Sequence, residues 1–275
     1  MRLAAITIFP IKSCRGIDVE AAVVERRGLR HDRRFMIVDD AARFVTQREE
    51  PALARVAVAL EGSLLVVAVD GHGEARTDAT PTEASLGPPA RVTVWNSTVD
   101  AFEVPMLSAF FASFLGREVR CVYMPESVRR ALSPAHARPG DVVSFADGYP
   151  LLVANEGSRL DLEARAGVPL EMARFRPNLV VSGAPAWEED RWGRIRVGPL
   201  WLRVAKPCAR CVMTTLDPRT GAVGKEPLRT LAAFRRVDGE VTFGLNLVPE
   251  LDDCSPPPTL RVGDPVACEV ARSAT

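Results

Sequence analysis

Short apolar stretches separated by turn residues fill the first part of the chain. The alternation typical of half-buried strands covers residues 2–9, which Pro10 ends, and residues 19–25. Two hairpins are predicted from apolar runs on either side of short turns. One joins residues 34–38 to residues 44–46, and the other joins residues 56–60 to residues 64–69. Strands at this spacing are typical of a barrel or a sandwich. We expect residues 71–90, rich in Gly, Pro, Thr and Asp, to form a long surface connection.

The apolar positions then change to helical spacing. Pro105 can begin a helix and Gly116 can end it, and apolar residues recur between them at Leu107, Phe110, Phe111, Phe114 and Leu115. This stripe predicts a helix that packs on the core. A second helix is predicted over residues 155–167, with Asn155 as its N-cap, and a third over residues 227–236.

The remaining apolar runs predict further strands, at residues 178–182, 194–197, 200–205 and 241–247, with a final pair around Leu260 and Val266. Strands and helices do not alternate regularly, so a parallel Rossmann sheet is not expected. The pattern predicts a β-rich α+β fold.

Composition narrows the class of protein. Hydrophobic residues make up 47% of the chain, and 35 Lys and Arg balance 35 Asp and Glu. A balanced charge argues against broad attraction to nucleic acid or to anionic membranes. No signal peptide is recognised, and no apolar run approaches the roughly 20 residues that span a bilayer. We therefore expect a cytoplasmic protein without a membrane partner.

The six cysteines are not expected to form a disulfide framework in a cytoplasmic chain of this size. Most of them, Cys254 among them, should be small buried hydrophobic residues. The close pair Cys208 and Cys211 is the exception. Because the three histidines are scattered, the chain does not readily supply a four-ligand zinc site.

A thioredoxin-like role for this pair would require it to open a helix after a strand. The residues that follow Cys211 are Val-Met-Thr-Thr, which favour a strand, and then Asp-Pro-Arg-Thr-Gly, which favours a turn. Lys206 and Arg210 are cationic neighbours that favour the thiolate, the form that binds soft metals. The alternative is a pair of buried thiols at a strand end.

The segment from Lys206 to Gly221 resembles the signature of the MOSC family, and most closely its amidoxime-reducing branch, in which Cys-x-x-Cys runs into Thr-Thr-x-Asp-Pro-x-Thr-Gly. The resemblance implies that Cys211 is the only protein ligand to molybdenum, and that Cys208 is a neighbour and not a ligand. It also implies that Ala209 and Arg210 line a molybdenum–molybdopterin cofactor.

Two N-terminal segments resemble the same branch. Residues 9–16, Phe-Pro-Ile-Lys-Ser-Cys-Arg-Gly, are similar to a signature in which Lys12 and Ser13 would bind the pterin phosphate. A Lys and a hydroxyl at a strand end suit that role, although the same residues also suit a solvated turn. In residues 31–35 the resemblance places an anion-binding point on Arg34, whose alternative is a surface hairpin edge. Residues 46–51 follow the pattern without an assigned role.

Two later segments complete the resemblance. Phe-Arg-Pro-Asn at residues 175–178 implies that Arg176 and Asn178 face the cofactor, where a guanidinium and an amide can grip the phosphate and the pterin edge. Asp147 begins a turn that also lines the cofactor in the family. The Gly148-Tyr149 that follows departs from the hydroxyl residues usual there.

The family implies an N-terminal β-barrel-like subdomain, here residues 1–120, packed on a C-terminal MOSC β-barrel, residues 121–275, with flanking helices and the cofactor in the cleft between them. It implies an oxidoreductase that reduces N-hydroxylated small molecules. A separate ferredoxin, cytochrome or flavoprotein reductase would supply electrons. One alternative is a carrier of the cofactor or of sulfur without turnover, and another is a zinc or thiol hydrolase.

Overall fold

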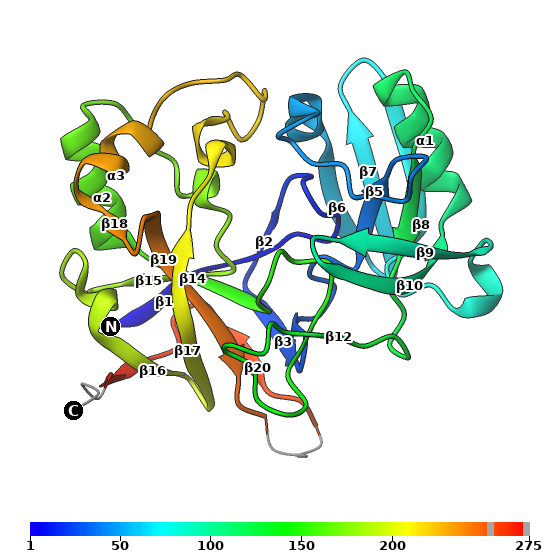
Figure 1. Ribbon diagram of the computed structural model, residues 1–275. Helices are drawn as coiled ribbons and strands as arrows, with labels where there is room; N and C mark the ends of the chain where they lie inside the picture. The colour runs from blue at the N-terminus through cyan, green and yellow to red at the C-terminus, as the bar shows by residue number, and fades with distance from the viewer. Residues whose placement is uncertain (252–255, 272–275) are drawn as a thin grey trace.

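A computed structural model describes residues 1–251 and 256–271, and it shows two β-rich lobes side by side (Figure 1). Among the described residues, nine strands form the largest sheet, in the order β2-β1-β15-β14-β19-β17-β16-β21, with β18 paired to β19. Its strands are β1 (Arg2–Ile8), β2 (Ile17–Val19), β14 (Leu151–Asn155), β15 (Leu179–Ser182), β16 (Trp192–Val197), β17 (Leu200–Ala209), β18 (Arg236–Val237), β19 (Glu240–Pro249) and β21 (Val266–Val270).

This sheet is the centre of the C-terminal lobe. Its pairs are antiparallel except β14 with β15, which are parallel because helix α2 (Glu156–Ala166) connects them. Helix α3 (Leu228–Phe234) lies beside α2 and contacts β19. A small sheet of β20 (Thr259–Arg261), β3 (Ala21–Glu25) and β4 (Gly28–Leu29) packs on the same core. The short strands β12 (Arg130–Ala131) and β13 (Val142–Val143) pair with each other.

The N-terminal lobe has two sheets and helix α1 (Pro105–Leu115), which packs against β8 and β11. One sheet has the order β5-β11-β10-β9, and the other has the order β6-β7-β8. Their strands are β5 (Phe35–Val38), β6 (Ala57–Glu61), β7 (Leu64–Val69), β8 (Gly73–Asp78), β9 (Pro89–Val94), β10 (Ser97–Glu103) and β11 (Arg120–Tyr123). Short 3-10 turns lie at Pro51–Arg55, Glu83–Ser85, Met172–Phe175, Glu188–Arg191 and Val212–Thr215.

Each lobe has its own core, formed by a separate cluster of buried apolar side chains. In the N-terminal lobe Phe35 and Phe111 are fully buried in one cluster. In the C-terminal lobe Leu3 and Ile6 of β1 pack with strand residues such as Val181. The first strand of the chain therefore belongs to the core of the C-terminal lobe.

The expected β-rich α+β fold is confirmed, and so are its helices. The Asn155 side chain accepts a hydrogen bond of 3.0 Å from the Gly157 amide, and Gly167 ends α2 in the left-handed conformation. The boundary at residue 120 stays a prediction. Within the described ranges no helix has the length and apolar character needed to cross a bilayer.

Three local predictions are wrong. Residues 71–90 are not one connection, because they contain β8, a 3-10 turn and the start of β9. Strand β8 exposes most of its side chains and turns Ala75 toward the core, so its polar composition concealed it. The stretch at residues 19–25 is split between β2 and β3. The two final strands around Leu260 and Val266 are present as β20 and β21, which pair with β3 and β16.

The third wrong prediction concerns the residues after Cys211. Val212–Thr215 is a 3-10 turn and not a strand. The hydroxyl of Thr214 donates to the Cys211 carbonyl at 3.0 Å, and that of Thr215 donates to the Val212 carbonyl at 2.8 Å. Side-chain hydroxyls that bond to nearby carbonyls support a turn over a strand.

The cysteines differ in burial. Cys14 and Cys121 are buried, whereas Cys208, Cys211 and Cys268 are partly exposed, and all five are free thiols. Burial raises the pKa of Cys14 to about 12, so this thiol stays protonated. Cys254 lies outside the described residues.

Candidate functional site

Cys211 lies at the junction of the two lobes, where β17 has ended and the 3-10 turn begins. The turn that follows it, residues 217–221, is closed by the Asp217 carboxylate, which accepts the amide of Thr220 at 2.8 Å and that of Arg219 at 3.1 Å. The Thr220 amide is the main reason that the pKa of Asp217 is lowered. The loop is therefore held in one shape beside the cysteine.

Arg48 approaches Cys211 from the N-terminal lobe. Its guanidinium NH2 group lies 3.4 Å from the Cys211 Sγ and 3.7 Å from an Asp147 carboxylate oxygen. The same guanidinium lies over the Trp95 ring, 5.1 Å from its centroid, and the Trp95 indole donates to Asp147 at 3.2 Å. Arg48 thus connects the thiol of one lobe to the carboxylate at the junction.

Lys12 holds the other side of Asp147. Its ammonium is buried, donates to the Phe145 carbonyl at 2.9 Å and forms an ion pair with Asp147. Burial lowers the pKa of Lys12. Burial alone would raise the pKa of Asp147, but the charge of Lys12 outweighs it and holds that pKa well below its ordinary value. The carboxylate is ionised and fixed between two cations.

A second group of charges lies around the Phe9 ring, with the guanidinium of Arg176 4.3 Å and that of Arg33 4.5 Å from its centroid. Arg33 donates to Asp32 at 2.6 Å and to the Asn178 side-chain carbonyl at 3.0 Å. Arg176 donates to the Cys14 carbonyl at 2.8 Å. Burial, with Arg33 nearby, lowers the pKa of Arg176 to about 10.

Asn178 holds this group of charges in place through hydrogen bonds. Its amide nitrogen donates to the Thr7 carbonyl at 3.1 Å and to Asp32 at 3.0 Å, and its oxygen accepts from the Leu152 amide at 3.2 Å as well as from Arg33. Because these bonds use the donors and acceptors of the amide, Asn178 positions Arg33 and does not present a free polar edge.

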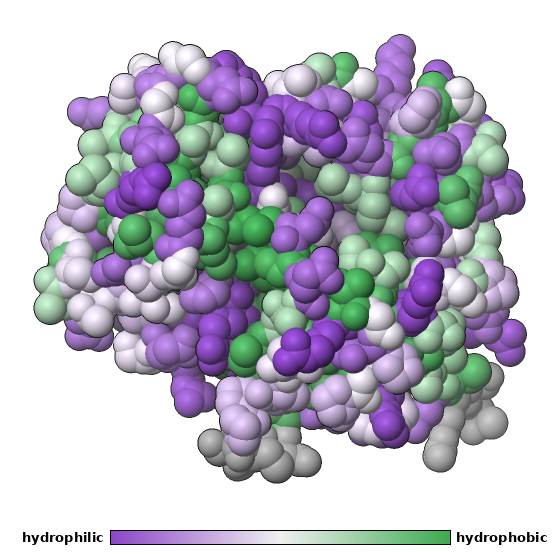
Figure 2. Space-filling model, turned by 180° about the vertical axis from the view of Figure 1, so that it is seen from behind, coloured by the Kyte–Doolittle hydropathy of each residue, from purple (hydrophilic) through white to green (hydrophobic). Residues whose placement is uncertain are grey.

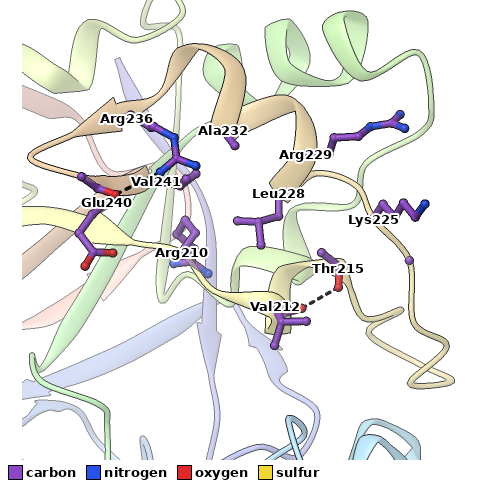
Figure 3. A pocket seen from close by; sticks show the side chains of 12 residues that line it. Arg210, Val212, Thr215, Lys225, Leu228, Arg229, Ala232, Arg236, Glu240 and Val241 are labelled. Atoms are coloured by element: carbon purple, nitrogen blue, oxygen red, sulfur yellow. Dashed lines mark hydrogen bonds between the residues drawn. The ribbon is translucent and has the colours of Figure 1, made fainter.

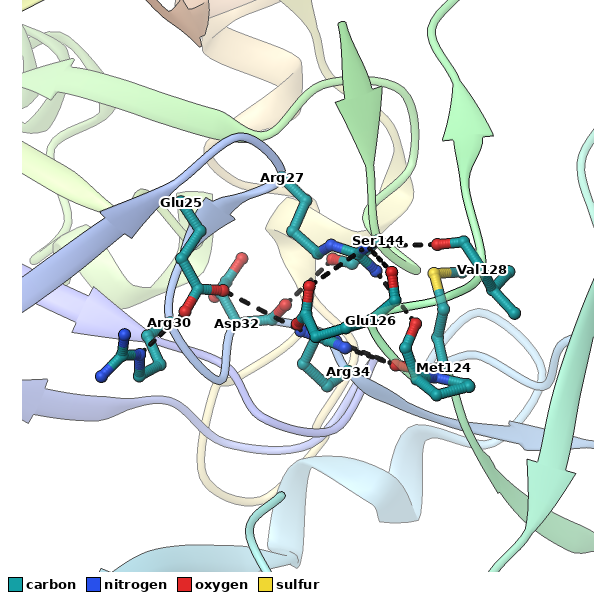
Figure 4. A network of polar contacts seen from close by, with 10 residues as sticks. Glu25, Arg27, Arg30, Asp32, Arg34, Met124, Glu126, Val128 and Ser144 are labelled. Atoms are coloured by element: carbon teal, nitrogen blue, oxygen red, sulfur yellow. Dashed lines mark hydrogen bonds and ion pairs between the residues drawn. The ribbon is translucent and has the colours of Figure 1, made fainter. Parts of the chain in front are cut away.

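Arg34 lies elsewhere, although it was expected at the cofactor (Figure 4). Its guanidinium donates to the Met124 carbonyl at 2.6 and 3.1 Å and pairs with Glu126, and its side chain is 3% exposed. Arg33 lies in a turn with a positive φ of 48°, whereas Arg34 directly precedes β5, so the two adjacent side chains leave the backbone in different directions and meet different partners. Arg33 is the residue beside Arg176 and Asn178.

The remaining expected residues flank these two groups. Ser13 is buried in the left-handed conformation, and its carbonyl accepts the Gln47 amide at 2.7 Å. Arg210 donates to the Phe175 carbonyl at 2.8 Å and lies 3.0 Å from the Cys208 Sγ. Ala209 is exposed at the end of β17. Figure 2 shows a hollow at the upper middle of the rear face, between the lobes and bordered by hydrophilic residues.

These residues suit an anionic cofactor with a soft metal. Cations outnumber carboxylates here, since Lys12, Arg33, Arg130 and Arg176 stand against Asp32 and Asp147. Burial is the main reason that the pKa of Lys12 is lowered, Asp147 opposes it, and the charges of Arg130 and Arg33 lower it further, so a phosphate would relieve the repulsion among these cations. A partly exposed thiol beside a guanidinium suits a soft metal. The site therefore fits a pterin phosphate and a thiolate-bound molybdenum.

Comparison with known proteins agrees with this fold. Residues 1–118 match the MOSC N-terminal beta barrel domain, and residues 140–267 match the MOSC domain. The chain is 30% identical to human mitochondrial amidoxime-reducing component 1, over 96% of this chain and 82% of that protein. It is 31% identical to the mouse protein of the same name, over 96% and 81%. A rice molybdenum cofactor sulfurase is 27% identical over 90% of this chain and 32% of that protein.

Fold and site together define a β-rich two-lobed protein with a cysteine at the lobe junction. The chain belongs to the MOSC family. Among these relatives, the rice protein is named for the molybdenum cofactor.

Arg48 and Trp95 are among the residues of the site that were not assigned a role from the sequence. Arg48 lies in residues 46–51, a segment that followed the family pattern, and that match was the available signal. Trp95 lies in the turn between β9 and β10 and has a positive φ of 54°, which a sequence pattern does not reveal.

Proposed function

We propose that this protein is a molybdenum-dependent oxidoreductase that reduces N-hydroxylated compounds. The observation that carries the proposal is the contact of Arg48 with Cys211, beside a junction that holds more cations than carboxylates. When bound, the cofactor would supply the two-electron chemistry that breaks the N–O bond. The reaction consumes two electrons and two protons, and the oxygen leaves as water.

The residues of the chain would bind and orient the cofactor. Cys211 would give its thiolate to the metal, and Lys12 and Ser13 would hold the pterin phosphate. Arg176 and Arg33 would contribute the neighbouring charge, with Asn178 holding Arg33 in place. Arg34 has no part in this proposal, because its guanidinium is used by Met124 and Glu126.

Three further residues would complete the pocket. Asp147 would keep Lys12 and Arg48 in place, since it pairs with both. Arg210 would fix the backbone before Cys211 through its bond to the Phe175 carbonyl, and Ala209 would border the cofactor.

The test compares Cys211→Ala with Cys208→Ala, both expressed in a host that makes molybdopterin. We expect near-stoichiometric molybdenum in the wild type and in Cys208→Ala, and its loss in Cys211→Ala. Reduction of an N-hydroxylated compound by reduced methyl viologen should follow the metal content. Turnover retained in Cys211→Ala would contradict the assignment.

The same experiment separates the alternatives. A carrier of the cofactor or of sulfur, favoured by the match to the rice sulfurase, would hold molybdenum but reduce no N-hydroxylated compound with any donor. Stoichiometric zinc without molybdenum would instead support a hydrolase.

A further inference from the structure

A shallow hollow of about 550 Å³ lies on the C-terminal lobe, between the 3-10 turn after Cys211, helix α3 and the β18–β19 hairpin (Figure 3). Its floor is apolar and is formed by Val212, Leu228, Ala232 and Val241. Cationic side chains also line it, namely Arg210, Lys225, Arg229 and Arg236. An apolar floor with a charged rim is the usual composition of a protein-binding patch.

The charge of this rim is only partly neutralised. Arg229 pairs with Glu226 at 2.6 Å, and Glu240 is the single carboxylate among the lining residues. Lys225 and Arg236 are exposed, and neither has a carboxylate within 4.0 Å in the described part of the chain. Two uncompensated cations therefore face solvent at the rim, and they favour a partner that carries carboxylates.

Exposed apolar side chains accompany these cations. Val212 is 45% exposed, and Val223, next to the lining residue Gly224, is 70% exposed. Single exposed valines are ordinary, but here they lie beside a ring of cations. A partner with an apolar residue surrounded by acidic ones would be complementary to this surface.

The hollow borders the cysteine turn at the residues on either side of Cys211. Arg210 and Val212 flank Cys211 in the sequence, and both line the hollow. The Cys211 Sγ instead meets Arg48 of the N-terminal lobe. A molecule seated in the hollow would therefore lie one residue of backbone away from the proposed metal ligand.

We propose that this hollow is the docking surface for the electron-donating protein, and that the donor is a small one-electron carrier with a ring of carboxylates around its redox centre. The inference rests on the proposed function. Each N–O bond reduced needs two electrons, so two reduced carriers are oxidised in turn while two protons come from water. Small interfaces with strong electrostatic steering are typical of such encounters.

The test reverses the two uncompensated cations in the double variant Lys225→Glu/Arg236→Glu. The control is Arg91→Glu/Arg196→Glu, which makes the same change of net charge at exposed residues of β9 and β16. Each is assayed with an N-hydroxylated substrate and either reduced methyl viologen, a plant-type acidic ferredoxin or an acidic flavodoxin. The carriers are tested at low and at high salt.

With at least one carrier, we expect kcat/KM to fall by about 10-fold or more in the rim variant at low salt, and its salt dependence to flatten. The control should lose much less, and the viologen-driven rate should be unchanged in both. A binding measurement independent of the metal uses the Cys211→Ala protein, where titration calorimetry should show the oxidised carrier bound more weakly after the same reversal.

Equal losses in the rim variant and the control would overturn the docking surface. The same holds if neither carrier reduces a wild-type protein that viologen reduces. If viologen also fails while molybdenum is bound, the proposed function is at fault, and the docking inference falls with it.

Discussion

The guanidinium of Arg48 lies 3.4 Å from the Cys211 Sγ, and the two residues come from different lobes. Arg48 also pairs with Asp147 at 3.7 Å and lies over Trp95. One side chain of the N-terminal lobe thus fixes the environment of the sulfur on the C-terminal lobe. The position of the sulfur therefore depends on how the two lobes meet.

Replacing Arg48 by Ala should reduce kcat/KM with reduced methyl viologen by about 10- to 100-fold, because a charge-assisted bond is worth about 1.5–3 kcal/mol. Arg48→Lys should recover part of the loss, since it restores the charge without the planar fork. Arg43→Ala, which removes an exposed arginine paired to Asp39, is the control. Equal activities of Arg48→Ala and the control would refute this role.

Arg33 and Arg34 should respond differently to substitution by Ala. Arg33→Ala removes a cation beside Arg176 and should lower the molybdenum content of the purified protein, with a modest effect on stability. Arg34→Ala leaves the Met124 carbonyl without its donor and should lower the free energy of unfolding by about 1–3 kcal/mol, with metal content largely kept. Elemental analysis and urea unfolding distinguish the two, and the opposite pattern would return the anion site to Arg34.

Acidification should weaken the contribution of Asp147. Its pKa in the folded protein is held below the ordinary value, chiefly by Lys12 against the opposing effect of burial. A lowered carboxyl pKa gives stability that is full above the unfolded pKa of about 4 and is lost as pH falls below it. The difference in unfolding free energy between wild type and Asp147→Asn should therefore be largest near pH 7 and shrink below about pH 4. A difference that stays constant with pH would contradict this ion pair.

Gly221 closes the loop after Cys211 against the N-terminal lobe. Its φ is +76°, and a Cβ there would lie 2.2 Å from the Pro51 carbonyl oxygen. Gly239 is a matched control, because its φ is +84° and nothing lies within 4 Å of its Cβ position. Gly239→Ala should destabilise by about 1 kcal/mol from backbone strain alone, and Gly221→Ala by more. Thermal unfolding measures both, and equal decreases in Tm would show that the loop accommodates the Cβ of residue 221 without an added cost.

The sequence predicted the parts of the fold whose signals are local. The stripe of apolar residues between Pro105 and Gly116 and the cap at Asn155 predicted α1 and α2, because spacing and capping act within one or two turns. The polar strand β8 was missed, since only its pairing with β7 and the burial of Ala75 make it a strand. Such pairing depends on residues far along the chain.

In the site too, residues with a local sequence signal were predicted, whereas residues whose role depends on distant contacts were not. Short motifs selected Cys211, Lys12 and Arg176, and the structure brings all three to the lobe junction. The choice between Arg33 and Arg34 required the direction of each side chain, which adjacent identical residues do not reveal. The role of Arg48 depends on a contact across 163 positions of sequence.

The place of β1 bears on how this chain is made. Arg2 of β1 pairs with Ser182 of β15, so β1 leaves the ribosome long before its partner, which is synthesised 180 positions later. Nascent chains extend from their N-terminus, and their domains generally fold as units in that order. Here the N-terminal lobe can fold while β1, which precedes it, still lacks β15 and is paired only with β2. Translation speed and chaperone access in that interval would then influence yield, and an isolated C-terminal half would lack one edge of its main sheet.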